Sequence, residues 1–141
     1  GSKFIFTFMN NHEGSFHFEG TSVLAKICPN LSEPHAQAFG IDVNERIFKV
    51  LYSGGFCVSD SVESYNIFED GIVTAYNPED FKKKIDHYLS NPDERRSIAH
   101  KGRELVKQKH TGFDRAHQII KYLDMHNLAN SILDKKMEFV K

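Results

Sequence analysis

The sequence has 141 residues, the length of a single compact domain. Hydrophobic residues make up 40% and charged residues 26%, which excludes a disordered chain and a repetitive fibre. No apolar run approaches the roughly 20 residues that cross a bilayer, and no secretory leader is recognisable, so we predict a soluble protein without a transmembrane segment. We interpret residues 1–2 as the remnant of a cleaved expression tag, which is compatible with a chain that begins partway through a longer protein.

The formal net charge of −1 conceals a gradient along the chain. Residues 1–78 carry 4 Lys or Arg against 9 Asp or Glu, whereas residues 79–121 carry 11 against 7. A surface that binds nucleic acid is usually densely basic. An excess of four positive charges spread over helices is instead typical of a solvated surface. Nucleic acid is therefore not an expected partner.

The first half of the chain contains three recognisable elements. Lys3–Met9 is rich in aromatic and branched residues and predicts a strand, whereas Val23–Cys28 is an apolar run that fits a strand or a short helix. A helix is expected from Asp42, which would form a capping box with Glu45. The helix ends at the glycine pair 54–55, which tolerates positive φ.

Strands and helices alternate in the second half. We predict strands at Phe56–Asp60 and Gly71–Tyr76, joined by a polar loop that contains residues 63–66. Further helices begin at the Asn-Pro pairs 77–78 and 91–92, near Gly112, and at Asn127. This alternation predicts an α/β three-layer sandwich with a parallel Rossmann-like sheet, shortened at the N-terminal side. Residues 3–125 would form the domain and residues 126–141 a C-terminal helical extension.

Two polar segments follow predicted strands and are candidates for a ligand site. In open α/β sheets, ligands lie beyond the carboxyl ends of the strands, facing helix N-termini that attract anions. Residues 32–40 and residues 60–66 occupy such positions and could form one cleft. Arg46 can bind a phosphate bidentately and Asn44 adds side-chain donors, which suits a diphosphate. The alternative to a ligand site is that Asp42 and Glu45 only cap the helix and that Arg46 is a surface residue.

A series of short motifs continues from this helix to the end of the domain. Asn44-Glu-Arg46 opens it, Gly54-Gly55-Phe56 and Ser59-Asp60 follow, and downstream come Phe68–Gly71, Asn77–Asp80, Tyr88–Pro92, Ile98-Ala99, Gly102-Arg103 and His110-Thr111. In this order and spacing the segment from Ile27 to Leu123 resembles the C-terminal, donor-binding Rossmann domain of family-4-like (group 1) glycosyltransferases, which have two Rossmann domains (the GT-B fold).

The resemblance implies transfer of a sugar from a nucleotide-diphosphate sugar to an acceptor. It implies that Asn44 and Arg46 face the diphosphate and that Glu33 and His35 lie near the donor sugar or nucleotide. The full set of expected donor-binding residues is Glu33, His35, Gly40, Asn44, Arg46, Lys49, Gly54 and Gly55, and no catalytic residue is assigned. The family needs no metal and no cofactor other than the donor. The expected partners are the nucleotide sugar and a missing N-terminal acceptor domain or partner chain, and peripheral membrane contact is compatible with this function.

One position departs from the family pattern. Many relatives carry a glutamate five residues before the first glycine of the pair, where it holds the ribose hydroxyls, but this chain has Lys49, which cannot accept a hydrogen bond. Lys49 could add charge near the phosphates or lie on the solvent side of the helix. It favours an alternative function, a catalytically degenerate domain that serves as an interaction module. A flavodoxin-like regulatory domain is a third hypothesis, although the expected site after its first strand is missing.

Other candidate sites are weaker. Cys28 and Cys57 lie in apolar segments and predict buried, reduced thiols, which favours a reducing compartment and a cytoplasmic location. The eight histidines include no pair with zinc-binding spacing, so no metal site is expected.

Overall fold

The sheet of the protein is short and entirely parallel. The structure is a computed structural model that describes residues 26–32, 38–40 and 43–140, so the strand predicted at Lys3–Met9 lies outside the described residues. The strands are β1 (Cys28–Asn30), β2 (Cys57–Asp60) and β3 (Val73–Ala75), in the order β1-β2-β3. Both neighbouring pairs are parallel, with Cys28 opposite Cys57 and Val58 opposite Val73. The segment predicted as strand or helix at 23–28 thus ends in a strand.

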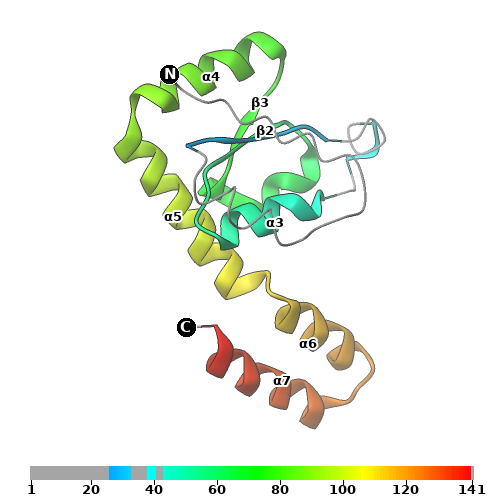
Figure 1. Cartoon of the computed structure of the whole chain (residues 1–141). Helices are drawn as coiled ribbons and strands as arrows, with labels where there is room; N and C mark the ends of the chain where they lie inside the picture. Colours follow the sequence, from blue (N-terminus) through cyan, green and yellow to red (C-terminus); the bar gives the residue numbers. More distant parts are fainter. Residues whose placement is uncertain (1–25, 33–37, 41–42, 141) are drawn as a thin grey trace, which may run out of the picture.

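Helices cover both faces of this sheet. The side chains of β2 alternate, so that Cys57 joins a core cluster with α3 (Glu45–Tyr52), while Val58 joins a second cluster with the first turn of α4 (Pro78–Ser90). Figure 1 shows α3 and α4 on opposite sides of the strands, with α5 (Pro92–Lys109) running past the sheet. The predicted three-layer α/β sandwich with a Rossmann-like parallel sheet is confirmed.

The start of α3 differs from the prediction. The N-cap is Asn44, whose Oδ1 accepts a hydrogen bond from the backbone N–H of Arg46 at 3.1 Å. Glu45 is the first helical residue, and its carboxylate lies 2.9 Å from Lys49 Nζ, one turn further along. The predicted capping box of Asp42 and Glu45 is therefore wrong, because the chain becomes helical two residues later; Asp42 itself lies outside the described residues.

The segment predicted as a polar loop between the second and third strands is a 3-10 helix, η1 (Glu63–Gly71). Tyr65 and Phe68 are buried in it, three residues apart. In a 3-10 helix, side chains three residues apart lie one above the other, so both rings point into the core. The loop prediction was wrong because the polar residues around Tyr65 and Phe68 obscure the three-residue spacing of these two buried rings.

Two Asn-Pro pairs begin helices, but only one asparagine caps with its side chain. Asn77 Oδ1 accepts a hydrogen bond from the N–H of Asp80 at 2.8 Å and begins α4 as predicted. Asn91 instead donates from Nδ2 to the carbonyl of His87, at 2.7 Å, and so closes the end of α4. The helix α5 begins at Pro92, as predicted, but without a side-chain cap from Asn91.

Two antiparallel helices, α6 (Gly112–Tyr122) and α7 (His126–Phe139), form a hairpin beyond the end of α5 (Figure 1). Thr111 and Asp114 form a capping box that the sequence analysis missed. Lys136 of α7 donates to Asp114 Oδ1 at 2.6 Å and to the carbonyl of Gln108 at 2.5 Å. This almost buried ion pair holds α7 against α6 and the end of α5. The helix predicted near the C-terminus is confirmed.

We expect the hairpin to weaken in acid. Burial opposes ionisation of Asp114, but hydrogen bonds from Lys136 and Thr111 outweigh it and hold the pKa of this carboxyl below its ordinary value. Because the folded-state pKa is lowered, the stabilisation is complete above the unfolded pKa of about 4 and is lost as the pH falls through the folded value. Urea unfolding of wild type and Asp114→Asn from pH 7 to pH 3 should show a stability difference that shrinks with acidity; a constant difference would contradict this.

Both cysteines are free thiols, as predicted. Burial raises the pKa of Cys28 to about 11 and raises that of Cys57 as well, so both stay protonated at neutral pH. Among the described residues, no helix has both the length and the apolar character needed to cross a membrane.

Candidate functional site at the carboxyl edge of the sheet

Polar side chains gather where β1 and β2 end. Asp60 Oδ1 accepts three hydrogen bonds, from the backbone N–H of Ser32 at 3.0 Å, from Ser32 Oγ at 2.9 Å and from Ser59 Oγ at 3.0 Å. Tyr65 Oη, which comes from η1, lies 2.5 Å from Ser32 Oγ. The segments after β1 and after β2, which the sequence analysis named as two candidate junctions, thus meet at one edge of the sheet.

The hydroxyl protons of this cluster have one consistent arrangement. Because Ser32 Oγ donates to Asp60, Tyr65 must donate to Ser32. Asn30, only 2% exposed, donates from Nδ2 to Ser59 Oγ at 2.9 Å, and Ser59 in turn donates to Asp60. Two chains of hydrogen bonds therefore end on the same carboxylate oxygen and fix its position at the edge of the sheet.

The first turn of α3 supplies the cationic part of the site. Arg46 is half-buried, and the N-terminus of the helix adds the positive end of the helix dipole. Burial is the main cause of the raised pKa of Cys57, with Cys28 and Asp60 raising it further and Arg46 lowering it. Arg46, in the first turn of α3, and Asp60, the last residue of β2, give this edge of the sheet one cation and one carboxylate.

The predicted site residues fall into three groups. Gly40, Asn44 and Arg46 lie between the end of β1 and the first turn of α3, and Gly40 has a φ of +66°. A Cβ at Gly40 would lie 3.4 Å from the Cβ of Glu63, at the start of η1. Gly54 and Gly55 lie at the opposite end of α3, about 12 Å along the helix axis. Their N–H groups bond to the carbonyls of Leu51 and Val50 and end the helix, so the structure does not bring them together with Asn44. Glu33 and His35 lie outside the described residues.

Lys49 lies midway along α3, one turn after Glu45. Its Nζ is 2.9 Å from Glu45 Oε1, and its side chain is 47% exposed. It lines an open cavity between α3 and the α6–α7 hairpin. In the structure this side chain therefore points toward the hairpin.

Sequence reasoning missed Asn30 and the roles of Ser32 and Tyr65. A signal was present for Asn30, because a polar residue that directly ends an apolar run stands at the carboxyl end of a parallel strand. No local pattern marks Tyr65, since its contact with Ser32 spans 33 residues of sequence. Across the described ranges 26–32, 38–40 and 43–140, no three His, Cys, Asp or Glu side chains gather in a group that could hold a metal ion.

The fold and the polar edge of the sheet together indicate the class of protein. A parallel sheet between helical layers, with polar side chains and a helix N-terminus at its carboxyl edge, is the arrangement of α/β domains that bind ligands at this edge. The family model described as glycosyl transferase-like matches residues 22–121, most of the chain. The chain therefore belongs to the glycosyl transferase-like family, as its motifs indicated. Comparisons with curated proteins and with solved structures give no match.

Proposed function

We propose that this domain binds the nucleotide-diphosphate sugar of a glycosyltransferase. The observation that carries the proposal is the first turn of α3, where Asn44 and Arg46 lie at the carboxyl edge of a parallel sheet in a member of the glycosyl transferase-like family. A helix N-terminus beside a guanidinium is a favourable environment for a diphosphate. Transfer of the sugar to an acceptor would then release the nucleoside diphosphate.

The charge distribution suggests an orientation for the donor. The carboxylate of Asp60 repels phosphate, so the diphosphate belongs nearer to Arg46 than to the end of β2. Carboxylate and hydroxyl oxygens are good partners for sugar hydroxyls, which places the sugar or ribose toward Asp60 and Ser32. As the bond to the sugar breaks, negative charge grows on the diphosphate, and the amides of α3 and Arg46 would stabilise it without a metal ion.

The rest of the enzyme would come from elsewhere. In this proposal the acceptor is bound by an N-terminal domain or a partner chain, and that part contributes any catalytic base. We further propose that the domain works in the cytoplasm, needs no cofactor besides the donor, and can act next to a membrane surface. The free thiols of Cys28 and Cys57 support a reducing compartment.

The test is a titration of the chain with UDP and GDP, followed by NMR or calorimetry. We expect saturable binding of one of them, weakened about 10- to 100-fold in Arg46→Ala, because hydrogen bonds to charged groups contribute about 1.5–3 kcal/mol. Arg103→Ala is the matched control, since Arg103 lies beside Gly54 at the other end of α3. A folded wild type that binds neither nucleotide at millimolar concentration would contradict the proposal. An equal loss of nucleotide affinity in Arg46→Ala and Arg103→Ala would contradict it as well.

A second candidate function is an interaction module that has lost donor turnover. Lys49 favours it, because a lysine cannot accept the hydrogen bonds that ribose hydroxyls donate and because this side chain pairs with Glu45 and lines a cavity on the hairpin side of α3. The Lys49→Glu variant separates the two candidates when UDP is compared with pyrophosphate. Donor binding predicts that UDP binds more tightly than pyrophosphate in both proteins. Wild type that binds neither, together with a variant that gains UDP binding, would support the degenerate domain.

A further inference from the structure

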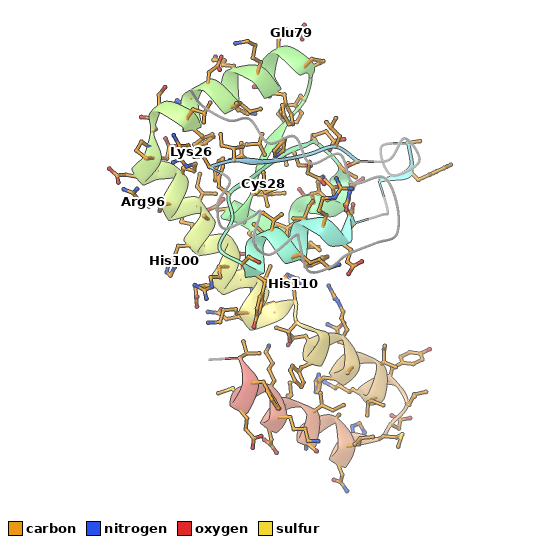
Figure 2. All side chains as sticks on the ribbon, viewed as in Figure 1. Lys26, Cys28, Glu79, Arg96, His100 and His110 are labelled. Atoms are coloured by element: carbon orange, nitrogen blue, oxygen red, sulfur yellow. The ribbon has the colours of Figure 1, made fainter. Side chains whose placement is uncertain are left out.

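A second concave site lies on the other side of α3 from the sheet. An open cavity of about 710 Å³ is formed by α3, the end of α5, α6 and α7. Its lining is largely apolar and includes Phe48, Tyr52, Val106, Phe113, Ile132 and Phe139. The volume falls within the range of about 300–1,000 Å³ that is typical of small-molecule sites. In Figure 2, His110, which also lines the cavity, lies at the end of α5 where the sheet domain meets the hairpin.

Two aromatic rings of the apolar lining stack on each other but remain partly exposed to solvent. The rings of Phe113 and Phe139 stack with centroids 6.0 Å apart and an interplanar angle of 15°, although Phe139 is 71% exposed. Aromatic surface held in a fixed geometry and left in contact with water gains free energy when an apolar ligand covers it. The rings therefore favour a ligand with an apolar body.

The charged groups of the lining favour an anion. Lys49 and Lys135 line the cavity, and Glu45 is the one acidic residue among the described residues that line it. Lys49 pairs with Glu45 at 2.9 Å on an exposed part of the helix, where such pairs are weak and exchange partners easily. Burial and the nearby Arg115 lower the pKa of His110, which favours its neutral form. Two lysines against one glutamate leave a net positive lining.

We propose that this cavity binds a fatty acid, with the alkyl chain on the rings of Phe113 and Phe139 and the carboxylate between Lys49 and Lys135. This assigns to Lys49, the residue that departs from the donor-binding pattern, a role in a different site on the same helix. A single chain suits a concave, partly enclosed space better than a second protein copy does, since stable protein interfaces bury about 1,200 Å² or more. The inference stands independently of the proposed donor site.

The test uses decanoate, decanol and decyltrimethylammonium, which share an alkyl chain and differ in the charge of the head group. Calorimetric titration of the whole chain, below the concentration at which the amphiphiles form micelles, should show saturable binding of decanoate, at least about tenfold tighter than that of the cationic compound. The double variant Lys49→Gln/Lys135→Gln should lose this preference, and Phe139→Ala should weaken decanoate and decanol alike. Lys83→Gln, which removes a lysine of α4 outside the cavity, should change neither.

Two results would overturn the proposal. One is that the folded wild type does not bind decanoate. This result counts against the proposal whether or not the chain self-associates in sedimentation experiments. The other is equal binding of all three compounds, or binding that survives in both the lysine and the phenylalanine variants, as nonspecific adsorption would. Thermal unfolding followed by circular dichroism confirms that each variant is folded. Because Phe139→Ala leaves the carboxyl edge intact, unchanged UDP binding by this variant separates a failure here from a failure of the donor site.

Discussion

Replacing Phe68 with alanine is expected to lower the free energy of unfolding by about 3–5 kcal/mol. The side chain is fully buried and belongs to the core cluster between the sheet, α3 and η1. Its ring centroid lies 4.9 Å from that of Phe48 and 6.1 Å from that of Tyr65. Truncation removes these contacts and leaves a cavity that a close-packed core cannot fill.

The measurement is urea unfolding followed by circular dichroism. Phe139→Ala is the control, because that ring is 71% exposed and should cost far less. Since a domain of this size is stabilised by about 5–15 kcal/mol, Phe68→Ala should remove a large part of the total. Equal effects of the two substitutions would show that Phe68 does not occupy the centre of the core. Because η1 also carries Tyr65, we expect the same variant to loosen the polar cluster at the carboxyl edge.

Gly102→Ala is expected to destabilise the protein by about 1–3 kcal/mol or more. A Cβ at this position would lie 2.6 Å from the carbonyl oxygen of Gly71 and 2.9 Å from Leu51 Cδ2. These contacts mark the place where α5 crosses η1, and the backbones can approach this closely only because both residues are glycines. Alanine usually stabilises a helix interior by about 1 kcal/mol relative to glycine, so the predicted effect has the opposite sign to the intrinsic helix propensity.

The matched control is Gly112→Ala. Gly112 is the first residue of α6, and a Cβ there meets no atom within 4 Å, so we expect a neutral or slightly stabilising effect. Gly71→Ala should resemble Gly102→Ala, because its Cβ would lie 2.6 Å from Gly102 Cα. Midpoints of urea unfolding compare the three variants. A Gly102→Ala variant more stable than wild type would contradict this prediction. It would mean that α5 and η1 can move apart without a cost in the free energy of unfolding.

The two proposed sites share one short helix. The N-terminal turn of α3 lies at the carboxyl edge of the sheet, and the middle of the helix, at Lys49, faces the hairpin cavity. The buried side, with Ile47, Val50 and Leu51, packs into the core cluster beside the sheet. A helix of eight residues thus has one buried side and two candidate binding regions.

The local elements of the chain were largely predictable. Asn77 and Pro78 mark the start of α4 because a side-chain cap and a fixed φ act within one turn, and the glycine pair 54–55 ends α3 for similarly local reasons. The order of short motifs also indicated the family, which the match over residues 22–121 confirms. The capping box of α3 was predicted two residues too early, because Asn44 is the N-cap of this helix.

By itself, the sequence determined the strand and helix alternation, the free thiols and the family, because each depends on neighbouring residues or on their order. Only the tertiary structure decided which side chains meet. Tyr65 reaches Ser32 across 33 residues, Gly71 approaches Gly102 closely, and Lys49 lines a cavity together with residues of α6 and α7. These contacts depend on the packing of distant segments, which no local pattern encodes.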